Sequence, residues 1–184
     1  ALYVGTMRTT SVTGTTTMEF GGAALGGDPV VLYLWNMYNR VPLAVYIADT
    51  TDSWVYTNAT YRSRNNSIGN RTTFVRGLDE DAVSVVIATV AMNDDVATFR
   101  SLHQSIGLDS VSTPSGRATT IGQHARLSQR FGLYGAYNGF PGQGLHFLQA
   151  IEASEVGGGA VATFFGDGAD AAYWQGAFMG VFYV

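Results

Sequence analysis

The sequence predicts an all-β fold: an antiparallel β-sandwich or jelly roll with one short helix at about residues 94–106. About ten short segments rich in β-branched and aromatic residues follow one another, with Gly, Asn and Asp between them, as in sandwich domains. No strands alternate with long helices, which a parallel α/β fold requires. The 184 residues suit a single domain spanning residues 1–184.

The expected strands are rich in Val, Ile, Thr and aromatic residues, which favour extended backbone. They cover residues 30–38, 41–48, 54–61, 71–76, 82–92, 117–121, 126–137, 145–152, 160–165 and 173–184. Residues 82–92 form the most apolar stretch and predict a central buried strand. Residues 173–184 are apolar and aromatic, so we expect them to be covered.

The single helix is predicted over residues 94–106, because Asn93 can cap its first turn. Apolar and histidine side chains follow near helical spacing, and Gly107 is a natural stop. Residues 9–17 are mostly Thr, Ser, Val and Gly, which predicts an edge strand. Alternatively, residues 1–20 form an extended arm that packs on a neighbouring subunit. Residues 138–144 predict a hairpin loop.

Charge is scarce in this chain. Charged residues make up 13% of it and hydrophobic residues 46%, whereas ordinary soluble domains are about 25% charged. A surface poor in charge is weakly protected against association, which indicates an oligomer or a part of a larger assembly. The net charge is -4, so no basic field exists to hold a nucleic-acid backbone.

All ten basic residues are arginine. This bias reflects either a GC-rich genome or a surface built for planar, bidentate contacts, which lysine cannot make. Cysteine is absent, which excludes thiol catalysis, disulfides and cysteine zinc sites but leaves the compartment open. No run is long and apolar enough for a membrane helix, and no leader pattern precedes Ala1. We expect no membrane partner, and a cytosolic product rather than a fragment of a longer precursor.

No pattern of catalytic or metal-binding residues stands out. His103, His124 and His146 lack the spacing of a metal site, and no G-x-S-x-G nucleophile motif is present. We therefore expect no catalytic residues, no metal and no cofactor. An enzyme would have to be a hydrolase built on His146, Glu152 or Asp167.

Aromatic rings beside arginine can bind sugars by stacking and hydrogen bonding, or anchor a protein interface. The candidate glycan- or partner-binding residues are Trp54, Tyr56, Arg62 and Arg64. Ordinary core packing is the alternative role for these rings. The candidate oligomer interface lies in the final strand and consists of Tyr173, Trp174, Phe178 and Phe182.

The C-terminal third carries a resemblance. Residues 144–152 (GLHFLQAIE) precede a Gly-rich turn, and residues 162–167 (ATFFGD) and 175–180 (QGAFMG) follow. These segments resemble the ends of tailed-bacteriophage virion β-domains of the head-decoration, head-fibre and tail-fibre type. The last strand is similar to the closing strand of tumour-necrosis-factor-like jelly rolls. The resemblance covers roughly 40 residues. It implies a virion surface or attachment protein that is trimeric.

A second resemblance leads elsewhere. Residues 43–45 and 60–63 are similar to the early strands of actinoporin-type pore-forming toxins. Those toxins carry an amphipathic N-terminal helix and lysine, whereas this chain begins with a Thr- and Gly-rich segment and has no lysine.

The leading expectation is a structural, decoration or attachment protein of a virion, made in the host cytoplasm. It would act by forming homotrimers and by contacting other virion proteins or a host surface glycan. A carbohydrate-binding, lectin-like module is the first alternative and an actinoporin-like pore-forming toxin the second. A secreted location is the alternative to the virion.

Overall fold

The computed structural model is nearly all β. It describes residues 2, 4–38, 40–80, 82–93, 100–115, 117–123, 130–155, 161–167 and 176–183. For Arg100 and residues 117–123 it describes the backbone alone. The regular structure of the described residues consists of strands apart from one short helical turn, and the sheets pack in a sandwich-like arrangement. The predicted all-β sandwich is confirmed.

Fifteen strands and one 3-10 turn follow one another along the described residues. They are β1 (Gly5–Met7), β2 (Met18–Ala24), β3 (Asp28–Leu32), β4 (Leu34–Asn36), β5 (Pro42–Asp49), β6 (Ser53–Val55), β7 (Arg62–Ser63), η1 (Arg64–Asn66), β8 (Arg71–Arg76), β9 (Val83–Asn93), β10 (Arg100–Leu108), β11 (Arg117–Gln123), β12 (Arg130–Gly139), β13 (Gly144–Ser154), β14 (Ala162–Phe165) and β15 (Ala177–Tyr183).

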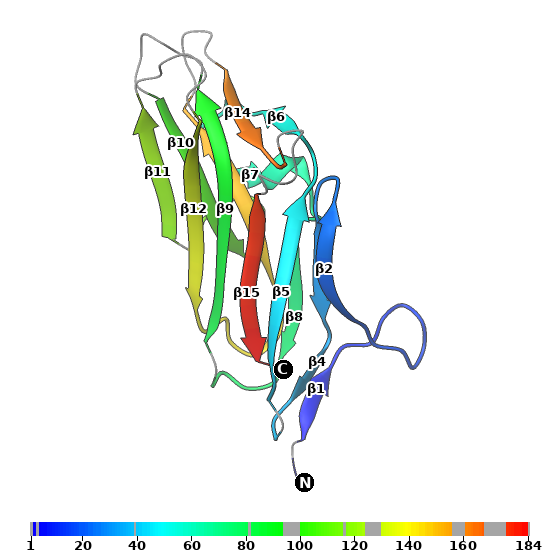
Figure 1. Ribbon diagram of the computed structural model, residues 1–184. Helices are drawn as coiled ribbons and strands as arrows, with labels where there is room; N and C mark the ends of the chain where they lie inside the picture. The colour runs from blue at the N-terminus through cyan, green and yellow to red at the C-terminus, as the bar shows by residue number, and fades with distance from the viewer. Residues whose placement is uncertain are drawn as a thin grey trace.

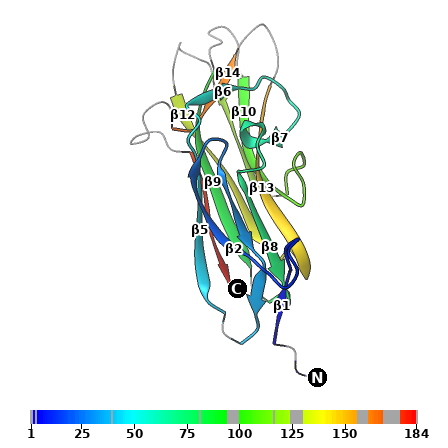
Figure 2. The same ribbon diagram turned by 90° about the vertical axis from the view of Figure 1, so that its right-hand side faces the viewer.

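The strands form two layers joined at both sides. One layer contains β12, β9, β15 and β5, side by side in Figure 1, and the other contains β10, β13, β8 and β3. β11 pairs with both β10 and β12, and β2 pairs with both β3 and β5, so these two strands link the layers. The side view in Figure 2 shows the layers on either side of the core. All pairings are antiparallel except β2–β5 and β3–β8.

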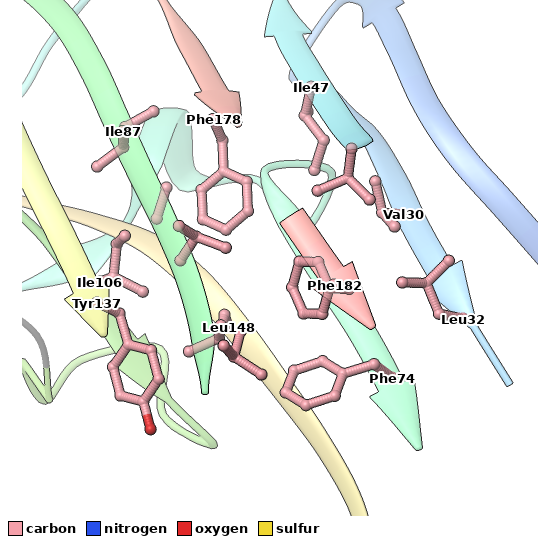
Figure 3. Packing of buried hydrophobic residues seen from close by; sticks show 14 residues of the cluster. Val30, Leu32, Ile47, Phe74, Ile87, Ile106, Tyr137, Leu148, Phe178 and Phe182 are labelled. Atoms are coloured by element: carbon pink, nitrogen blue, oxygen red, sulfur yellow. The ribbon is translucent and has the colours of Figure 1, made fainter. Parts of the chain in front are cut away.

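Alternation along the strands builds the core. In β9 the side chains of Val83, Val85 and Ile87 are buried, whereas Ser84 and Val86 are exposed, as the period of two requires. The larger apolar cluster joins both layers, and Figure 3 shows Ile87, Phe178 and Ile47 of the front layer over Phe74, Leu148 and Ile106 of the other.

A second apolar cluster lies toward the β6–β14 end. It contains Ala91, Leu102, Leu133, Ala162 and Phe164. Between the two clusters, the inward position is polar on three strands: Thr89 on β9, Gln104 on β10 and Glu152 on β13. The core is therefore divided by a polar layer.

The predicted helix is wrong over residues 100–106, which belong to β10; residues 94–99 lie outside the described residues. β10 pairs with β11 on one side and β13 on the other, so it satisfies its backbone as a central strand. Its apolar side chains Leu102 and Ile106 join the two core clusters, with the buried Gln104 between them, and the strand is also buried at Ser101 and Ser105. Tertiary pairing overrides the local helical spacing.

Other boundaries also differ from the prediction. The expected strand over residues 54–61 ends at Val55, and the expected strand over residues 30–38 divides at Tyr33. Residues 138–144 do not close a hairpin, since β12 and β13 pair with different neighbours and lie in different layers. Parts of three expected strands lie outside the described residues: 126–129, 160, 173–175 and 184.

The N-terminal segment forms a separate two-stranded ribbon. β1 pairs only with β4, with Thr6 opposite Trp35, and Figure 1 shows the ribbon beside the lower end of the sandwich. The expected edge strand over residues 9–17 is wrong. Residues 8–17 form a loop closed by the Thr10 amide donating to the Thr15 carbonyl at 2.9 Å.

Candidate functional site

The four residues expected to bind a glycan or partner lie together in the fold. β7 pairs with β13, which places Arg62 opposite Glu152, and η1 begins directly afterwards with Arg64. β6 adds Trp54 beside the same carboxylate. Together with Asp49 and Asn70, these residues form what we call the ionic cluster: Asp49, Trp54, Arg62, Arg64, Asn70 and Glu152.

Glu152 is fully buried and accepts several hydrogen bonds. The Trp54 indole Nε1 donates to both of its carboxylate oxygens at 2.9 Å. Arg62 donates from Nε at 3.0 Å and from Nη2 at 2.9 Å, and the Asn65 amide donates at 3.2 Å. A buried carboxylate with these donors is held in one orientation.

Arg64 is also fully buried. Its Nη1 donates to Asn70 Oδ1 at 2.9 Å and lies 3.5 Å from Asp49 Oδ2. Its guanidinium carbon lies 4.9 Å from the centre of the Trp54 ring. A Cβ atom at Gly176 would come within 2.2 Å of Arg64 Nη2, so only glycine fits beside this guanidinium.

The two acids of the cluster have opposite pKa shifts. Burial raises the pKa of Glu152, and the Trp54 hydrogen bond and the charges of Arg62 and Arg64 oppose this only in part. Burial acts the same way on Asp49. There the Arg64 charge and the hydrogen bonds from Thr51 and Asn70 outweigh it, so the pKa of Asp49 is lowered.

The ionic cluster is a structural feature rather than a binding surface. The Arg64 side chain is wholly inside the chain and cannot reach a glycan, which corrects its expected role. Trp54 is half-buried, its N–H is used by Glu152, and its ring stacks against Phe164 with centres 6.4 Å apart. The guanidinium carbon of Arg62 lies 3.8 Å from the centre of the Tyr56 ring, and the Tyr56 hydroxyl donates to the Thr60 carbonyl at 2.6 Å.

The candidate hydrolase residues make separate contacts. His146 Nδ1 lies 2.8 Å from Asp109 Oδ2, and Asp109 also accepts from the Phe147 amide at 2.8 Å. Glu152 is enclosed in the ionic cluster, and the Asp167 amide donates to the Thr51 carbonyl at 3.3 Å. Nothing in the spacing of the sequence marked Asp109 as a histidine partner.

The part of the chain that the structure describes shows neither a metal-binding cluster nor a membrane-spanning helix. There, no group of three or more His, Asp or Glu side chains gathers to hold a metal ion. None of its helical segments has the length and apolarity needed to cross a membrane. His124 lies outside the described residues, and the His103 ring meets the Tyr61 ring edge-on at 6.0 Å.

The expected oligomer interface needs a correction. Phe178 and Phe182 point into the core of their own chain, as Figure 3 shows, and their exposed fractions are 0% and 2%. β15 is an interior strand between β5 and β9, so its inward rings have no surface to offer a second molecule. Tyr173 and Trp174 lie outside the described residues.

The opposite side of the same strand is exposed and apolar. Met179, Val181 and Tyr183 alternate with the buried rings and are 43%, 42% and 41% exposed. Met179 is opposite Tyr46 of β5 on one side and Val86 of β9 on the other. Exposed apolar side chains thus continue across neighbouring strands.

We call this surface the uncharged face. It consists of the outward side chains Pro42, Ala44, Tyr46, Ser84, Val86, Ala88, Tyr134, Ala136, Asn138, Met179, Val181 and Tyr183 of β5, β9, β12 and β15. The outward positions of β5, β9 and β15 carry no charged side chain. β12 contributes one, Arg130 at its first residue, whose guanidinium lies 4.2 Å from the centre of the Phe165 ring. The face points toward the viewer in Figure 1.

The sequence contained a signal for this face. Residues 177–183 are apolar on both sides of the strand, which predicts burial on both sides but does not say which side a neighbouring molecule covers. The position of β15 in the middle of an outer layer decides that only its phenylalanines face the core.

Comparison with known proteins gives no relative. No family model, no curated protein and no solved structure matches the chain.

Proposed function

We propose that this protein is a structural protein that works by associating with copies of itself on the surface of a virion. The observation that carries the proposal is the uncharged face, which extends over four strands of one layer. Large exposed apolar patches on a soluble domain are typical of interaction sites. The low charge of the whole chain, 13% of residues, supports the same conclusion.

The virion setting follows from the resemblance of the C-terminal segments to phage virion β-domains. The proposed partners are further copies of the chain, other virion proteins and a host surface glycan. A trimer, which that resemblance implies, requires two different complementary surfaces on every copy. A face that meets its own counterpart closes a dimer instead.

The ionic cluster supports a structural role. Asp49, Arg64 and Glu152 are buried in internal contacts, so these charges do not form an open polar site. The carbohydrate-binding alternative is weaker, since Arg64 is enclosed and Trp54 and Tyr56 hold other partners.

Light scattering after size-exclusion chromatography tests the proposal. At micromolar concentration we expect the wild-type protein to elute with a mass that is a multiple of the chain mass, because the apolar face is covered in the associated form. A single chain mass at every concentration would contradict self-association.

A further inference from the structure

We infer that the uncharged face binds the same face of a second copy of this chain across a two-fold axis. The inference rests on the proposed function, because it names the partner of the surface on which that function depends. Its support comes from the position, composition and area of the face.

The position of the face limits how a partner can bind. β9 and β15 are paired on both sides, so a partner cannot add a strand at their edges. In the middle of the face it can therefore only lay a surface on the outward side chains. Sheets that pack face to face lie about 10 Å apart with their strands nearly aligned. A flat sheet layer from a second copy has this geometry.

The composition of the face argues against a charged partner. A nucleic acid requires lysine or arginine against its phosphates, and the outward positions of β5, β9 and β15 supply none. The six largest side chains of the face have exposed fractions between 39% and 56%: Tyr46, Val86, Tyr134, Met179, Val181 and Tyr183. A surface without charges is best covered by one that also lacks them.

The area of the face can be compared with what a dimer needs. The six largest side chains of the face, 39% to 56% exposed, leave on the order of 500 Å² for a partner to cover, against about 800 Å² per partner in a standard stable interface. The largest apolar patch on a typical monomer is about 300–600 Å². The face therefore supplies more than half of the area that a standard dimer interface buries on each partner.

The arrangement of large and small side chains also suits a two-fold axis. One cross-strand row runs from Tyr46 through Met179 and Val86 to Ala136. A two-fold axis that lies in the plane of the interface, parallel to the strands and between Met179 and Val86, reverses the row of the partner, so that Tyr46 of one copy lies over Ala136 of the other. The Tyr46 ring of one copy then meets the Ala136 methyl group of the other, and this pairing of a large with a small side chain favours close packing.

Single-cysteine cross-linking tests the inference, because the chain has no cysteine of its own. Val86→Cys and Met179→Cys, the two positions of the row beside the axis, are made one at a time and treated with a short bis-maleimide. A residue links to its own copy only near a two-fold axis, and facing sheets about 10 Å apart are too distant for a disulfide, so a bis-maleimide linker is used. Ile68→Cys, 68% exposed and outside the four strands, is the matched control.

We expect a covalent dimer from at least one position of the row and none from Ile68→Cys. The inference is overturned if the wild type is oligomeric by light scattering but no position of the row cross-links to itself. It is also overturned if cross-links form only when a face cysteine is mixed with Met7→Cys of the β1–β4 ribbon, as a head-to-tail trimer would give. A monomeric wild type refutes the proposed function itself, so the two failures are distinguishable.

Discussion

Asp49 holds a negative charge inside the sandwich, where an unpaired charge is costly. Its Oδ2 accepts from Asn65 and Asn70, each at 3.1 Å, and lies 3.5 Å from the Arg64 guanidinium. Loss of one partner of a buried ion pair leaves the other uncompensated. Asp49 and Arg64 therefore depend on each other for their place in the fold.

Asp49→Asn should lower the free energy of unfolding at neutral pH by up to about 3–5 kcal/mol, because Arg64 loses the stronger of its two buried counter-charges and keeps only Glu152. The pKa of Asp49 is lowered from 3.8, so its stabilising contribution is present above that pH and is lost as the pH falls through the lower pKa of the folded state. Urea unfolding across the acid range measures both effects.

The gap between Asp49→Asn and the wild type should therefore narrow below about pH 4. Asp52→Asn, at an exposed position, is the control and should change stability by less than about 0.5 kcal/mol. If the difference in unfolding free energy between Asp49→Asn and the wild type stays constant through the acid range, the charge of Asp49 is not the cause of the difference.

Close contact between the two layers depends on a glycine in β12. A Cβ atom at Gly135 would lie 2.8 Å from the Cα atom of Ser105 and 2.9 Å from Ile87 Cγ2. Gly132, three residues earlier in the same strand, would meet only the Tyr134 hydroxyl at 3.3 Å. A comparison of Gly135→Ala with Gly132→Ala therefore separates the effect of the tight contact between the layers from the general effect of adding a methyl group to β12.

Gly135→Ala should destabilise the protein by about 1–3 kcal/mol, because β12 must move away from β10. Gly132→Ala should be near neutral, since the Tyr134 side chain is exposed and can shift. Urea midpoints of the two variants give the comparison. Equal midpoints would mean that the approach of β12 to β10 is not tight.

At this scale the sequence predicted strands better than it predicted their partners. The apolar, β-branched composition of residues 82–92 located β9 nearly to its ends. The apparent helix over residues 94–106 failed over β10, because pairing on both sides decides its backbone. Hairpins between neighbouring strands were assumed, yet β12 and β13 lie in different layers.

The site was predictable only in part, for a related reason. Trp54, Tyr56, Arg62 and Arg64 are near one another in sequence and do lie together. Their common partner, Glu152, is distant in sequence, so local composition could not show that they surround a buried carboxylate. The same limit hid which side of β15 is exposed.

For the whole molecule, the distribution of charge explains the proposed behaviour. The chain has few charged residues, and Asp49, Arg64, Arg76 and Glu152 among them are buried. A buried charge contributes neither to the hydration of the surface nor to the repulsion between copies of the chain. The uncharged face is the part of the described surface where this shortage covers four adjacent strands.

Sedimentation equilibrium of Met179→Arg beside the wild type tests this account most directly. A charge at the middle of the face leaves the core untouched, since Met179 points outward and is 43% exposed. We predict that the wild type and Ile68→Arg sediment as an oligomer, whereas Met179→Arg sediments as a single chain. Circular dichroism should show that Met179→Arg is folded. An oligomer that persists in Met179→Arg would contradict the claim that copies associate through this face.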